Sequence, residues 1–131
     1  MNILPDSPFV TDLGLKIVEW TQGRAVLSVE LTERLQNRHG SGHGGVTATL
    51  LDVALAVAAR SLTGEWKMEG TITLNLQFLS PARGRLIAEG RLLKVGASMA
   101  FCEGEARDQN GTLIAKATAT YKIERNPCPT L

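Results

Sequence analysis

Residues 43–59 read HGGVTATLLDVALAVAA, and this stretch decides the fold. It is apolar on almost every side, which is typical of a helix buried at the centre of a domain. We expect this helix to run from about residue 45 to residue 62. Asp52 is the only Asp, Glu, Lys or Arg in the stretch. A carboxylate in apolar surroundings is costly unless it is paired or used, so Asp52 is the first candidate for chemistry.

Strand-like segments lie on both sides of this helix. Two precede it and turn at Thr21-Gln22-Gly23, and four follow it, the last two joined by a hairpin turn at Gln109-Asn110-Gly111. Residues 71–78 alternate polar and apolar side chains without a break, which predicts a strand with one buried face. The predicted strands are residues 15–20, 24–32, 71–78, 86–95, 99–108 and 113–123. This ββ-α-ββββ order predicts an α+β domain in which one mainly antiparallel sheet curves around the helix.

Length and composition are those of one globular domain. The 131 residues carry a net charge of +1 and no long basic run, which gives nucleic acid no electrostatic support. No apolar run approaches the roughly 20 residues that span a bilayer, and the N-terminus does not resemble a signal peptide. Cys102 and Cys128 form no disulfide framework or metal-binding spacing, so we expect a reducing cytoplasm and no metal. The domain core is expected at about residues 12–123, with a poorly ordered tail at 124–131.

The helix start offers a second chemical group. Gly44-Gly45 would leave backbone N–H groups open, where developing negative charge can be held, so this amide and the Asp52 carboxylate together suggest acyl-transfer hydrolysis. Asp52 lies roughly 10 Å along the helix from that amide, whereas groups at one reacting centre need to be within about 3 Å of it. A two-fold dimer with antiparallel neighbouring helices would bring Gly44 of one chain beside Asp52 of the other. We therefore predict two composite sites per dimer.

Three further residues are candidates for this site. Asn37 could orient the water or the leaving group, Thr71 could offer its hydroxyl to Asp52, and His43 adjoins the open amide. The plainer alternatives are that Asn37 makes local turn hydrogen bonds, that Thr71 is an ordinary strand residue, and that His43 only orients its loop. Asp52 itself would act either as general base on water or as nucleophile on the carbonyl, and the residues leave both open.

NRHGSGHGG at residues 37–45, followed by TLLD at 49–52, resembles the hotdog-fold acyl-CoA thioesterases of the phenylacetate-degradation type. FLSPA at 78–82 and KVG at 94–96 are also similar to that family's later strands and turns. The resemblance covers about residues 12–123. It implies that Asp52 is the catalytic carboxylate, that Gly44 supplies the amide that polarises the thioester carbonyl, and that Asn37 contacts the water or the leaving group. The match includes His43, and at Thr71 some relatives have Ser.

The resemblance also implies a homodimer, commonly assembled into a homotetramer, with coenzyme A in the dimer groove as part of the substrate and no separate cofactor. The candidate coenzyme A contacts lie in two turns and are Arg83, Arg85, Lys94, Gly96 and Ser98. The expected function is hydrolysis of an acyl-CoA, aliphatic or phenylacetyl-type, to the free acid and coenzyme A. A hotdog dehydratase is a weaker alternative, because that family's Pro-rich His motif is absent. A non-catalytic protein that binds acyl thioesters or aromatic ligands stays open, as does an acyl-carrier protein as the thiol carrier.

Overall fold

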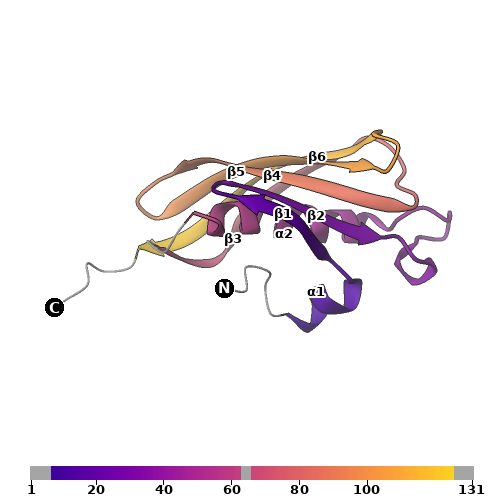
Figure 1. Cartoon of the computed structure of the whole chain (residues 1–131), viewed down its shortest axis with the longest axis horizontal. Helices are drawn as coiled ribbons and strands as arrows, with labels where there is room; N and C mark the ends of the chain where they lie inside the picture. Colours follow the sequence, from indigo (N-terminus) through magenta and orange to yellow (C-terminus); the bar gives the residue numbers. More distant parts are fainter. Residues whose placement is uncertain (1–6, 63–65, 126–131) are drawn as a thin grey trace.

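The computed structural model describes residues 7–62 and 66–125, which form one curved sheet and one long helix (Figure 1). The predicted order ββ-α-ββββ is confirmed, with a short helix added ahead of the first strand. In chain order the elements are α1 (Pro8–Leu13), β1 (Lys16–Thr21), β2 (Arg24–Glu30), the 3-10 turn η1 (Glu33–Leu35), α2 (Gly44–Arg60), β3 (Trp66–Phe78), β4 (Arg85–Val95), β5 (Met99–Asp108) and β6 (Leu113–Arg125).

Several predicted boundaries were wrong by a few residues. The long helix ends at Arg60 instead of residue 62, and β3 begins at Trp66, five residues before the alternating run. Residues 124 and 125 belong to β6, while the rest of the predicted tail lies outside the described residues. The sequence does carry local signals for α1, because Ser7 accepts a hydrogen bond from the Val10 N–H and Gly14 ends the helix in the left-handed conformation.

The sheet has the strand order β1-β2-β4-β5-β6-β3, and every neighbouring pair is antiparallel. It is not closed, so β1 and β3 are its two edges. Helix α2 lies along one face and packs mainly on β4, β2 and β5 (Figure 1). Because the sheet curves around it, α2 buries most of its side chains, while a stripe of half-buried residues that includes Ala48, Asp52 and Ala56 runs along one side.

Two glycines let the helix backbone approach the sheet closely. Gly90 of β4 and Gly104 of β5 are paired directly across the sheet beneath α2. A Cβ on Gly90 would lie 2.7 Å from the Ala54 carbonyl oxygen, and one on Gly104 would lie 2.7 Å from Cδ1 of Leu55. Neither position has room for a side chain, so these glycines set the distance between helix and sheet.

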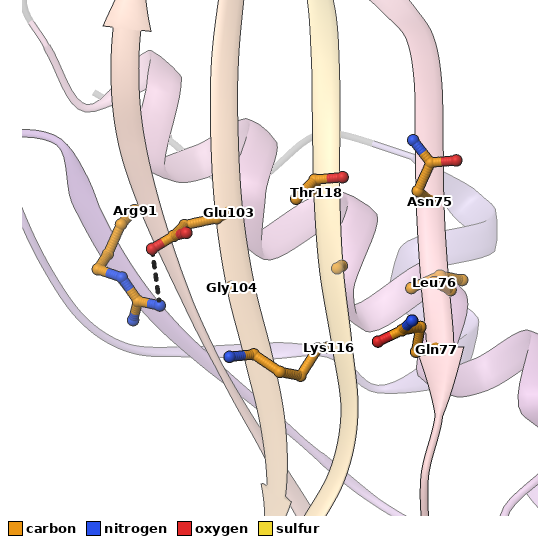
Figure 2. Close-up of a pocket in the computed structure, with 9 residues that line it drawn as sticks. Asn75, Leu76, Gln77, Arg91, Glu103, Gly104, Lys116 and Thr118 are labelled. Atoms are coloured by element: carbon orange, nitrogen blue, oxygen red, sulfur yellow. Dashed lines mark hydrogen bonds and ion pairs between the residues drawn. The ribbon is translucent and has the colours of Figure 1, made fainter.

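The opposite face of the sheet is polar, with a hollow of about 360 Å³ across β3, β6, β5 and β4 (Figure 2). Arg91 binds Glu105 at 2.7 Å, Glu89 at 2.8 Å and Glu103 at 3.4 Å. The hydrogen bond from Arg91 holds the pKa of the Glu105 carboxyl below its usual range. None of the predicted site residues lines this hollow.

The predicted unbroken alternation at residues 71–78 is wrong at its start. In β3, Thr73 pairs with Thr120 and Thr71 pairs with Tyr121, so Ile72 is an extra, bulged residue between them. An extra residue shifts the phase of a strand by one and turns the preceding side chain to the other face. Thr71 therefore points towards α2, whereas continuous alternation would place it on the polar face, and Ile72 is 47% exposed.

Candidate active site

Asp52 lies near the middle of α2, half-buried, with two hydroxyl groups at its carboxylate. Its Oδ1 accepts hydrogen bonds from Thr71 Oγ1 at 3.0 Å and from the Tyr121 hydroxyl at 3.1 Å. The Tyr121 hydroxyl also lies 2.7 Å from the main-chain carbonyl oxygen of Asp52. Burial, followed by the charge of Asp52, raises the pKa of Tyr121 well above its usual range, so this phenol stays protonated.

The other candidate group is at the start of the same helix. His43 is the N-cap residue, and its Nδ1 accepts a hydrogen bond from the Gly45 N–H at 2.9 Å. The helix begins at Gly44, whose own N–H has no hydrogen-bond partner among residues 7–62 and 66–125. The arrangement leaves one backbone donor of the first turn available to an acceptor from outside the chain.

Asn37 shares a pocket of about 400 Å³ with Gly44, and Phe78 forms part of the wall. The Asn37 side chain also makes the local turn bonds of the plainer alternative: its Oδ1 accepts from the His39 N–H at 2.9 Å, and its Nδ2 donates to Ser41 Oγ at 3.0 Å. A Cβ added to Gly44 would lie 3.5 Å from Cε1 of Phe78, an ordinary contact. The pocket thus joins an amide side chain, an open backbone N–H and an aromatic ring.

Within one chain these groups form two separate halves. Asp52 is eight residues after Gly44, about 12 Å along the helix axis, and it does not line the pocket that holds Gly44 and Asn37. Thr71 and Tyr121 belong to the carboxylate half. The chain alone therefore holds a carboxylate with hydroxyl partners at one place and an open amide at another.

The predicted coenzyme A contacts also fall into two groups. Arg83 donates from Nη1 to the Gly40 carbonyl oxygen at 2.8 Å, and Arg85 lies 3.8 Å from a carboxylate oxygen of Glu30. These two residues precede β4 or begin it, whereas Lys94, Gly96 and Ser98 lie at its far end and in the following turn. The ends of an 11-residue strand are roughly 30 Å apart, so one chain does not bring the two groups together.

Tyr121 is the residue that the sequence analysis missed. It lies in a strand with regular alternation, 69 positions from Asp52, and nothing nearby in the sequence points to a partner. The one available signal was a phenolic hydroxyl on the apolar side of β6, since a buried hydroxyl needs a hydrogen-bond partner.

No helix among residues 7–62 and 66–125 is long and apolar enough to cross a bilayer. The same part of the chain contains no group of three or more His, Cys, Asp or Glu side chains that could hold a metal ion.

The chain is similar to known thioesterases in both sequence and structure. A family model described as the thioesterase superfamily matches residues 39–115. The medium/long-chain acyl-CoA thioesterase YigI of Salmonella typhimurium is 31% identical, over 88% of this chain and 85% of the relative. A thioesterase family protein from Silicibacter pomeroyi superposes with a TM-score of 0.84 at 29% identity, covering 92% of this chain and 91% of that one. A variant of the phenylacetic acid degradation protein PaaI from Thermus thermophilus superposes with a TM-score of 0.78 at 25% identity, covering 88% and 98%.

Proposed function

Because the chain belongs to the thioesterase superfamily, as a hotdog-fold thioester hydrolase of the PaaI type, we propose that it hydrolyses acyl-CoA thioesters at sites shared between two copies of the chain. One observation supports a site shared between two chains. The open N–H of Gly44 and the carboxylate of Asp52 are separated by about 12 Å of helix within one chain, which is too far for both to act on the same reacting centre. The name of the YigI relative favours coenzyme A as the thiol carrier.

The second copy would cover the β3 edge of the sheet. β3 pairs with β6 on one side only, and Ile72 and Phe78 on this strand are 47% and 56% exposed. Leu79, directly after the strand, is also exposed. Apolar side chains along an open edge favour pairing with another copy. A two-fold axis beside β3 would set the two α2 helices antiparallel, so that each Gly44 amide faces the partner's Asp52.

The proposed chemistry uses the Gly44 amide of one chain and the Asp52 carboxylate of the other. The Gly44 N–H binds the thioester carbonyl oxygen and holds its negative charge in the tetrahedral intermediate. Asp52 takes a proton from the attacking water, and collapse of the intermediate breaks the C–S bond and releases coenzyme A as the thiol. In the nucleophilic alternative, Asp52 attacks the carbonyl and forms an anhydride. A single turnover in ¹⁸O-labelled water distinguishes the two routes, because only hydrolysis of an anhydride can put label into the Asp52 carboxylate.

The remaining predicted residues either bind substrate or support the groups that do. Asn37 lines the Gly44 pocket and orients the water or the leaving thiol. His43 caps α2 and fixes the direction of the open amide. Arg83 and Arg85 of one chain and Lys94 of the other would contact coenzyme A phosphates, since charge-assisted bonds suit that group. Gly96 and Ser98 shape the turn beside Lys94.

Release of free thiol from short-chain, medium-chain and phenylacetyl-CoA tests the proposal. We expect Asp52→Asn to lower kcat by about 10²–10⁴-fold, because the isosteric amide cannot act as a base. Full activity in this variant would remove Asp52 from the mechanism. Thiol release from none of the substrates by the native chain would favour the non-catalytic binding protein.

The Gly44 amide can be tested by deleting its N–H. Gly44→Pro does this at the first helical position, where proline is tolerated, and His43 before it already has the extended conformation that a following proline requires (φ −62°, ψ 136°). We expect kcat to fall by about 10²–10³-fold, the cost of losing one oxyanion donor. Gly44→Ala is the matched control, because it keeps the N–H and its Cβ makes only an ordinary contact with Phe78. Equal activities in the two variants would contradict the role of the amide.

A further inference from the structure

We propose that Tyr121 is a positioning residue for Asp52: its hydroxyl, together with that of Thr71, holds carboxylate oxygen Oδ1, so that Oδ2 is the oxygen that meets the reacting water. The inference rests on the proposed role of Asp52 and extends it from the residue to a particular atom.

The geometry begins with the pairing of β3 and β6. Thr71 and Tyr121 are direct partners across these strands, and the bulge at Ile72 turns Thr71 to the same side as Tyr121. Two neighbouring strands thus each present a hydroxyl to the same oxygen, at 3.0 and 3.1 Å. Among residues 7–62 and 66–125, Oδ2 has no hydrogen-bond partner and no cation pairs with Asp52.

Tyr121 also fixes the helix on which Asp52 lies. The side chain is 1% exposed, and its hydroxyl lies 2.7 Å from the Asp52 main-chain carbonyl oxygen. One hydroxyl proton is therefore shared between the backbone and the side chain of the same residue. This arrangement restricts both the position of the helix turn and the rotation of the carboxylate.

The electrostatics keep Tyr121 in the form that can donate a hydrogen bond. Its raised pKa, due mainly to burial, keeps the phenol protonated over the working range of pH. The other titratable group that acts on Tyr121 is Cys102 of β5, and burial raises the pKa of that thiol to about 12, so it is neutral. Tyr121 therefore remains able to donate its hydrogen bond to Oδ1 of Asp52.

Tyr121→Phe tests the inference, because it removes the hydroxyl and keeps the ring. We expect kcat to fall about 10-fold with little change in KM, and the acid limb of the kcat–pH profile to move to higher pH, since a carboxylate that loses a donor is protonated more easily. Ser61→Ala is the control. It removes a buried hydroxyl that bonds the Gly23 N–H and the Ala58 carbonyl oxygen at the far end of α2, so it should lower the melting temperature and leave the profile unchanged.

A spectroscopic test does not depend on activity. The chain contains one tyrosine, so 3-fluorotyrosine supplied during growth labels position 121 alone. We expect the ¹⁹F chemical shift to titrate with the acid limb of the native enzyme and to lose that titration in Asp52→Asn. A shift that is constant across the limb would overturn the inference, even if Tyr121→Phe failed to fold. If Tyr121→Phe folds and the acid limb of its kcat–pH profile does not move, the inference is also overturned, but the proposed function is unaffected. Full activity in Asp52→Asn would overturn both the inference and the proposed role of Asp52.

Discussion

At the scale of single residues, Gly44 and Gly45 differ in the use of their N–H groups. The Gly45 N–H is taken by the ring of His43, and the Gly44 N–H is open. The distinction comes from the N-cap conformation of His43, because that conformation brings Nδ1 back over the second helical residue. The sequence singled out Gly44 and Asp52 from their neighbours along the chain. It could not single out Tyr121, because the contact with Asp52 forms only after two distant segments pack together.

The buried thiol of Cys102 gives a prediction at the same scale. In Cys128→Ser only Cys102 remains, and it is 1% exposed with a pKa raised by burial to about 12. At pH 8 the thiol should be neutral, with about one part in 10⁴ as thiolate, and it should not react with Ellman's reagent until denaturant is added. Rapid reaction of the native variant would contradict the burial. An unreactive Cys102 also keeps the background of the thiol-release assay low.

At the scale of elements, the contact between α2 and the sheet depends on Gly90 and Gly104. The alternating pattern of β4 and β5 predicts which face is buried, and both strands were placed to within a residue. The pattern does not say how closely the helix approaches. That distance follows from two glycines that become neighbours only through the register of β4 and β5.

Gly104→Ala should therefore destabilise the fold. Its Cβ would overlap the Glu89 carbonyl oxygen and lie 2.7 Å from Cδ1 of Leu55, so the strand or the helix must shift. Overpacking of this kind costs about 1–3 kcal/mol of unfolding free energy, measurable by urea unfolding at fixed protein concentration. Gly44→Ala, where the added Cβ is 3.5 Å from Phe78, should unfold close to the native midpoint. Equal midpoints for the two variants would show that α2 does not lie as close to β5 as described.

The β3 bulge shows where periodicity stops being informative. Residues 71–78 alternate without fault in the sequence, yet the strand carries an extra residue at Ile72. The position of the bulge depends on the pairing of β3 with β6, and the sequence of one strand does not show the register of its partner. The predicted hydrogen bond between Thr71 and Asp52 is present in the structure, but it forms because of the bulge, which the sequence pattern does not predict. A catalytic role for Thr71 stays a prediction.

At the scale of the whole molecule, the proposed shared site predicts that two inactive variants restore each other's activity when they are combined. Asp52→Asn keeps the Gly44 amide, and Gly44→Pro keeps the carboxylate. A mixed dimer then holds one complete site and one that lacks both groups. Equal amounts refolded together should give about a quarter of native activity, because half of the dimers are mixed and each has one working site of two. Activity no higher than that of the separate variants would place Gly44 and Asp52 in one chain's own site.

Light scattering on the native chain would count the copies and test the expected tetramer of two dimers.

The strand order also has a consequence in time. β3 is synthesised before β4, β5 and β6, but its sole neighbour among the described strands is β6. At about 5–20 residues per second, several seconds separate the completion of β3 from that of β6. During this interval a strand with an apolar side has no partner in its own chain and can pair with a strand of another nascent copy. The edge proposed to join two finished subunits is thus also the edge at which premature association between unfinished chains would begin.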